Sequence, residues 1–252
     1  MQCPEWVRVE RAGLDFIVSS DDANAMRYVG GKFRCYQKLI NLIPRHRFYI
    51  ETHLGGGAVL RHKIPAELNL GIDRDPRVIA SFAGFPVNYR FLCSRAEDFL
   101  ATHPFRGDEF IYADPPYWPH SRASSRPVYR FDYKAEDHVK LLRLFMGLPC
   151  KVMISGYANE VYTEMLAGWE CHTFKGTSQT GGREESLWLN YSPAEVHDVR
   201  FLGHTFRDRQ GIKRKRQRWL ARFSREPLNV QQALLLDLNG AFAARRDHPD
   251  QC

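Results

Sequence analysis

The chain has 252 residues, enough for one full α/β domain with appendages but too few for two domains of ordinary size. Its hydrophobic content of 44% supports a sizeable core, and no apolar run is long enough to cross a bilayer as a helix. The net charge is +7, and residues 191–252 carry 12 Lys and Arg against 7 Asp and Glu. This basic C-terminal end indicates a polyanionic partner, with an ordinary solvated helix face as the alternative.

The cysteines and histidines give no sign of a metal centre. The six cysteines lie far apart and form no Cys-x-x-Cys pair, which argues against structural zinc and against a disulfide framework. The histidines include no recognised ligand spacing, so we expect reduced thiols and no metal. The residues after Met1 lack the pattern of a secretory signal, so we expect a cytoplasmic protein without a membrane partner.

Helical and strand patterns alternate along most of the chain. Residues 1–26 lack periodicity and are predicted to form an N-terminal arm, and residues 32–43 show helical spacing. Strands are predicted at 47–54, 69–73, 89–93, 110–113 and 151–155, and further helices at 78–82, 135–146 and 160–166. This alternation predicts a parallel sheet, whose ligands bind beyond the carboxyl ends of the strands. Residues 169–174 and 185–191 are predicted to pair as an antiparallel hairpin that closes the sheet.

The predicted domain organisation follows from these patterns. A catalytic domain is expected over residues 27–192, after the arm at 1–26. A basic helical extension is expected over 193–239, with one helix at 206–223, and a disordered tail over 240–252.

The motif Asp114-Pro115-Pro116-Tyr117 follows directly after a predicted strand. An aromatic amino group is a poor nucleophile because its lone pair is delocalised into the ring. If the Asp114 carboxylate and a prolyl carbonyl each accept one N–H, the lone pair can turn toward a methyl donor, while Tyr117 stacks on the base. The motif therefore indicates methyl transfer to a planar amine, and the alternative is a common Pro-Pro turn after a strand.

The glycines near the N-terminus do not fit the two best-known nucleotide motifs. A phosphate-binding loop would need glycine at Met26 and a hydroxyl at Phe33, and a dinucleotide-binding loop would need glycine at Leu60. At the junction that follows the strand at 47–54, Gly55 and Gly57 allow close approach of the backbone to a ligand. Asp73, at the end of the second strand, is placed to accept hydrogen bonds from ribose hydroxyls.

In this order the motifs resemble the Dam family of DNA adenine methyltransferases, over roughly residues 26–191. The segments that carry the resemblance are residues 28–32, residues 51–59, Asp73 and residues 114–117, followed by Ser155-Gly156-Tyr157 and the strand at 185–191. The resemblance implies a Rossmann-like S-adenosylmethionine-dependent methyltransferase fold, with a mostly parallel seven-stranded sheet. It also implies S-adenosylmethionine as co-substrate and DNA as partner.

The resemblance further implies which residues bind the cofactor. They are Tyr28, Gly30, Gly31, Lys32, Glu51, Gly55, Gly57, Asp73 and Asp114, the last serving both substrates. Lys32 is expected to pair with the methionine carboxylate. Candidates for contacts to the cofactor's adenine are Glu97 and Asp98.

The chain departs from the family pattern at the DNA-binding region. Between Leu100 and Glu109 there is no room for the target-recognition domain that such enzymes insert. We therefore expect DNA contacts from the loop at 118–133, the loop at 176–183 and the basic helix. The candidate residues are Arg122, Arg126, Arg130, Lys213, Arg214, Lys215 and Arg216. Solvated surface positions are the alternative for all of them.

Three functions remain open at this point. The first is methylation of the adenine N6 amino group in DNA. The second is the same chemistry on RNA, on cytosine N4 or on a protein glutamine. The third is a catalytically idle nucleic-acid-binding subunit, against which the intact Lys32, Asp73 and Asp114 argue.

Overall fold

The computed structural model describes residues 32–119, 130–175, 184–193, 197–203 and 205–247. The chain divides into two compact units, Met1–Val199 and Arg200–Cys252. The N-terminal arm predicted at 1–26 and the loop at 176–183 lie outside the described residues.

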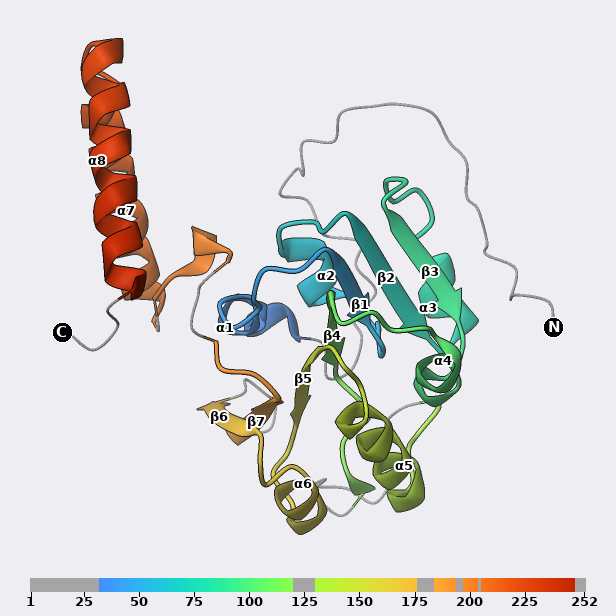
Figure 1. The fold of residues 1–252 in the computed structure, drawn as a ribbon. Coiled ribbons are helices and arrows are strands. Elements are labelled where there is room, and N and C mark those ends of the chain that lie inside the picture. The colour runs from blue at the N-terminus through green and yellow to red at the C-terminus, as the bar shows by residue number, and fades with distance from the viewer. Residues whose placement is uncertain (1–31, 120–129, 176–183, 194–196, 204, 248–252) are drawn as a thin grey trace. The chain divides into compact units, whose positions relative to one another are not determined.

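The first unit is built on a seven-stranded sheet with the order β3-β2-β1-β4-β5-β7-β6 (Figure 1). Its strands are β1 (Phe48–Glu51), β2 (Leu68–Asp73), β3 (Tyr89–Cys93), β4 (Glu109–Ala113), β5 (Lys151–Gly156), β6 (Glu170–Lys175) and β7 (Glu184–Leu189). Strands β1 to β5 pair in parallel, whereas β7 pairs antiparallel with both β5 and β6. The predicted parallel sheet with an antiparallel closing hairpin is therefore confirmed.

Short helices connect the strands and cover both faces of the sheet. They are η1 (Lys32–Arg34), α1 (Tyr36–Ile40), α2 (Ala58–His62), α3 (Pro76–Ala80), α4 (Ala96–Thr102), α5 (Ala135–Met146) and α6 (Glu160–Met165). Chain order reverses direction in the sheet at β1, so right-handed crossovers place α2 and α3 on one face and α4 and α5 on the other. The predicted helix at 32–43 is divided into η1 and α1, and α4 was not predicted.

Burial on both faces explains why the central strands read as continuous apolar runs. All five residues of β4 are buried, and Ile111 and Ala113 join the core cluster formed with α4, α5 and α6. The intervening residues Phe110 and Tyr112 point to the other face, because side chains alternate along a strand. The core thus fixes β4 from both sides, and the residue that follows it is Asp114.

The second unit is helical. It contains α7 (Phe206–Phe223) and α8 (Leu228–Asp247), and η3 (Val199–Phe201) spans the boundary between the units. Helix α7 matches the predicted range and begins with a capping box between Thr205 and Asp208. Helix α8 was not predicted, and it continues through residues 240–247, which we expected to be a disordered tail. Its Ala- and Leu-rich sequence favours a helix despite Gly240.

Among the described residues, no helix is long and apolar enough to cross a membrane.

Candidate active site

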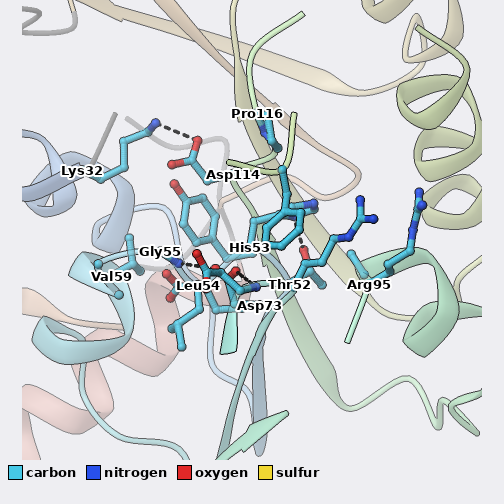
Figure 2. A pocket seen from close by; sticks show the side chains of 18 of the residues that line it. Lys32, Thr52, His53, Leu54, Gly55, Val59, Asp73, Arg95, Asp114 and Pro116 are labelled. Carbon is cyan, nitrogen blue, oxygen red and sulfur yellow. Dashed lines mark hydrogen bonds and ion pairs between the residues drawn. The ribbon is translucent and has the colours of Figure 1, made fainter. Parts of the chain in front are cut away.

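Asp114, Pro115, Pro116 and Tyr117 lie directly beyond the carboxyl end of β4, as predicted. Asp114 and Pro116 line a pocket that also includes Lys32, the glycine turn after β1 and the ends of β2 and β4 (Figure 2). The parallel sheet brings these residues together because β1, β2 and β4 end at the same edge.

Lys32 reaches the motif at 114–117 from the start of η1. Its Nζ lies 2.7 Å from Asp114 Oδ1 and donates to the Tyr117 hydroxyl at 3.1 Å. The same Nζ lies 3.3 Å from Glu185 Oε2 on β7. Burial by itself lowers the pKa of Lys32, but the neighbouring negative charges outweigh burial and hold that pKa well above its usual value. Lys32 is therefore a buried cation beside the Asp114 carboxylate (Figure 2).

A second donor reaches the same carboxylate oxygen from β5. Ser155 Oγ donates to Asp114 Oδ1 at 2.7 Å, and it lies 3.0 Å from the hydroxyl of Tyr112 on β4. Ser155 and Tyr112 are buried, and parallel pairing of β4 with β5 sets their separation. Two donors of fixed position therefore hold one oxygen of Asp114. Within the described part of the chain, the other oxygen, Oδ2, has no hydrogen-bond donor.

Tyr117, the last residue of the motif, packs against a second aromatic ring. The rings of Tyr117 and Tyr157 have centroids 4.2 Å apart with an interplanar angle of 34°. Tyr157 follows β5, so the motif after β4 and the segment after β5 meet at this edge of the sheet. Such faces suit a planar ring as a stacking partner.

The glycine turn after β1 is held to the end of β2. Gly55 and Gly57 both have positive φ, at 47° and 62°. The Gly55 N–H donates to Asp73 Oδ2 at 2.9 Å, and the Asp75 N–H donates to Asp73 Oδ1 at 2.8 Å (Figure 2). Burial raises the pKa of Asp73, although these two hydrogen bonds lower it. A carboxylate accepts about four hydrogen bonds, so Asp73 can still accept from a ligand.

Glu51 lines the pocket but is held by the protein itself. Its Oε2 accepts from the Tyr49 hydroxyl at 2.7 Å and from the Leu60 N–H at 3.0 Å. Burial raises the pKa of Glu51 to about 8. Its visible role is to join β1 to α2, and a contact with the cofactor stays a prediction.

The pocket residues that were not predicted as site residues include His53, Arg95 and Tyr133. His53 Nε2 lies 2.9 Å from the Tyr133 hydroxyl, and burial lowers the pKa of His53 to about 4, which keeps its ring neutral. The spacing of His53 and Tyr133, 80 residues apart, gave no signal in the sequence.

Arg95 lines the pocket two residues before Glu97, the first of the two acids suggested for contact with the cofactor's adenine. It pairs with Glu97 Oε2 at 3.2 Å and with Asp137 Oδ1 at 2.7 Å. Glu97 is fully buried, and neither Glu97 nor Asp98 lines the pocket. The suggestion of these two acids was wrong, because α4 turns Glu97 into the core and leaves Asp98 at the surface.

The predicted DNA-binding residues occupy separate places. Arg130 lines the pocket and lies 3.3 Å from Asp75 Oδ1. Lys213, Arg214, Lys215 and Arg216 are exposed on α7 in the second unit. Arg122 and Arg126 lie outside the described residues, as do Tyr28, Gly30 and Gly31 of the predicted cofactor site.

Within the described ranges, no group of three or more His, Cys, Asp or Glu residues could hold a metal ion.

Comparison with known families identifies the central part of this site. Residues 73–178 match the family of D12 class N6 adenine-specific DNA methyltransferases. The predicted family resemblance is confirmed. The matched segment contains Asp73, the motif at 114–117 and Ser155, whereas Lys32, the glycine turn and Glu185 lie outside it. The match supports methyl transfer as the reaction of this D12-like site.

Solved methyltransferase structures are similar to this chain at low identity and with TM-scores below 0.5. The N-methyltransferase NodS from Bradyrhizobium japonicum, in complex with S-adenosylhomocysteine, is 12% identical over 62% of this chain and 85% of its own, with a TM-score of 0.45. Magnesium protoporphyrin IX methyltransferase from Synechocystis, with bound S-adenosylmethionine, is 12% identical over 62% of this chain and 80% of its own, with a TM-score of 0.37. No curated protein matches the sequence significantly.

Proposed function

We propose that the protein transfers a methyl group from S-adenosylmethionine to the N6 amino group of adenine in DNA. The observation that carries this proposal is the fixed orientation of Asp114. Its Oδ1 is held by Lys32 and Ser155, and Tyr117 of the same motif packs against the Tyr157 ring. This arrangement suits a planar amine, and the D12 family match makes adenine in DNA the favoured acceptor.

We propose that the pocket beside Asp114 binds S-adenosylmethionine. Its glycine turn is required by the fold, because φ at Gly57 is 62° and a Cβ there would lie 2.6 Å from the Phe82 ring. We propose that this turn admits the methionine part of the cofactor and that Asp73 accepts from the ribose hydroxyls. The predicted contacts of Tyr28, Gly30, Gly31 and Glu51 with the cofactor belong to the same proposal.

The catalytic residues act by positioning. When bound, S-adenosylmethionine supplies a methyl group on a sulfonium: the N–C bond forms as the C–S bond breaks, and sulfur keeps the electron pair. Asp114 Oδ2 accepts one amino N–H, a prolyl carbonyl of the motif accepts the other, and Tyr117 stacks on the base. The nitrogen lone pair is then directed at the methyl group, and the cationic product nitrogen releases one proton to water.

Lys32 has a role in this proposal that differs from its predicted one. We expected it to bind the methionine carboxylate, but its shortest contact is with Asp114. The Lys32 Nζ at 2.7 Å holds one oxygen of the Asp114 carboxylate in place, which leaves the other oxygen to accept from the substrate. Lys32 also lines the pocket, so its contact with the methionine carboxylate of the cofactor remains part of the proposal.

The test is transfer from tritiated S-adenosylmethionine to DNA, RNA or protein, followed by identification of the labelled product. We expect label in N6-methyladenine from DNA, lost in Asp114→Ala. The matched control is Glu164→Ala, which removes an exposed carboxylate of α6 and should leave transfer unchanged. Label only in RNA, in N4-methylcytosine or in glutamine would replace adenine with that acceptor. Cofactor binding without any transfer would favour an idle nucleic-acid-binding subunit.

A further inference from the structure

We infer that α7 binds the phosphate backbone of duplex DNA through one row of side chains, Arg207, Arg214, Arg218 and Arg222, flanked by Lys215. The inference rests on the proposed function in one respect, because DNA is the substrate proposed there. It concerns a different surface, in the second unit, and its test measures binding without methyl transfer.

The charge of the protein is concentrated in this helix. Helix α7 carries eight Lys and Arg side chains and one acidic side chain, Asp208, so its net charge is +7. The whole chain also has a net charge of +7, so all other residues together sum to zero. Helix α8, in the same unit, carries two basic and two acidic residues. Solvation of a surface helix does not require such an excess of positive charge, whereas binding to a polyanion is favoured by it, because each neutralised phosphate releases counterions.

Helix geometry sorts these charges into a row. Successive residues of an α-helix are rotated by about 100°, so residues separated by four, seven or eleven positions share one side. Arg207, Arg214, Arg218 and Arg222 meet this spacing, and all four are exposed. From Arg207 to Arg222 the row is about 22 Å long at 1.5 Å per residue.

The same geometry corrects the sequence interpretation of the basic run at 213–216. Four consecutive residues cannot face one ligand, because i and i+1 point to different sides of a helix. Arg214 belongs to the row and Lys215 flanks it. Lys213 and Arg216 point away from it.

Gly211 lies in the row, between Arg207 and Arg214. A Cβ at Gly211 would have no atom within 4 Å, so packing inside the described structure does not require glycine there. Glycine inside a helix costs about 1 kcal/mol relative to alanine. Glycine at position 211 would be explained by a partner that approaches the helix backbone closely.

The side of α7 opposite the row is apolar in part, with Ile212, Trp219 and Phe223. A basic amphipathic helix of this kind also fits an anionic membrane surface. Duplex DNA is favoured because it presents one charge per about 1.7 Å of its axis, so a rigid row of about 22 Å meets phosphates along its whole length. The D12 family match points to the same polymer.

The experiment compares two double variants of the full-length protein. Arg214→Gln with Arg218→Gln removes two charges from the row, and Lys213→Gln with Arg216→Gln removes two charges from the other sides. Glutamine is a good helix former, and far-UV circular dichroism verifies that both variants keep their helix content. Binding to a labelled duplex of about 25 base pairs is measured by fluorescence anisotropy between 50 and 200 mM salt, without cofactor.

We expect the row variant to bind about tenfold more weakly near 100 mM salt and to lower the slope of log K against log salt by about 2. The off-row variant should change the slope by less than half of that. If both variants lose affinity for the duplex equally, or if neither loses affinity, the inference that this row of side chains binds DNA is wrong. Tighter binding of wild type to vesicles rich in phosphatidylserine than to the duplex would reassign α7 to a membrane surface. Duplex binding that depends on the row, together with no methylation of DNA, would contradict the proposed function and leave this inference standing.

Discussion

Replacement of Ser155 by alanine tests whether the orientation of Asp114 controls the reaction. Ser155 is fully buried and donates to Asp114 Oδ1 at 2.7 Å, the length of a charge-assisted hydrogen bond. A hydrogen bond to a charged group contributes about 1.5–3 kcal/mol. The lower end of this range applies because Lys32 remains on the same oxygen at 2.7 Å. A loss of about 1.5–2 kcal/mol in the transition state corresponds to a roughly 10- to 30-fold lower kcat.

The effect should separate kcat from cofactor binding. Ser155 does not line the pocket, so the dissociation constant of S-adenosylmethionine should stay within about twofold of wild type. Single-turnover methylation of DNA measures the chemical step, and isothermal titration calorimetry measures the cofactor. Ser155→Thr keeps the hydroxyl and should recover a part of the rate that Ser155→Ala loses. An unchanged single-turnover rate in Ser155→Ala, or a loss that appears only in cofactor affinity, would refute the reasoning.

Two further predictions concern stability. Gly57→Ala should destabilise the fold by about 2 kcal/mol or more in urea unfolding, because φ is 62° and the new Cβ would lie 2.6 Å from Phe82. Gly168→Ala, where a Cβ meets no atom within 4 Å, is the control, and an equal loss in both would contradict the steric argument. The folded pKa of Glu51, about 8, exceeds the ordinary 4.5, so the stability that its proton contributes is complete below about pH 4.5 and is lost as pH rises to about 8. As pH rises across that window, the free energy of unfolding of Glu51→Gln should therefore increase by roughly 2–4 kcal/mol relative to that of wild type. If the difference in unfolding free energy between the two proteins does not change with pH, Glu51 is not a buried, protonated group.

The sequence by itself determined the order of the strands along the chain and the position of the motif at 114–117. Alternation of short apolar runs with helical spacing predicted the parallel sheet, because strands buried on both faces read as continuous apolar segments. The motif at 114–117 was predicted at a strand end, and it lies there, directly after Ala113 of β4. The helix at 206–223 was also predicted with its observed bounds, because its charge and spacing are local features.

Only the tertiary structure decided which residues surround Asp114. Lys32, Ser155 and Glu185 are far apart in the sequence, and they meet because η1, β5 and β7 come together beside β4. Buried polar contacts of this kind depend on how elements distant in the sequence pack together, which no local pattern encodes. Lys32 lines the pocket as its predicted role requires, and its shortest contact in the fold is with the Asp114 carboxylate, while its pairing with the methionine carboxylate stays a prediction. Burial raises the strength of the pairing with Asp114, and burial is a property of the assembled fold.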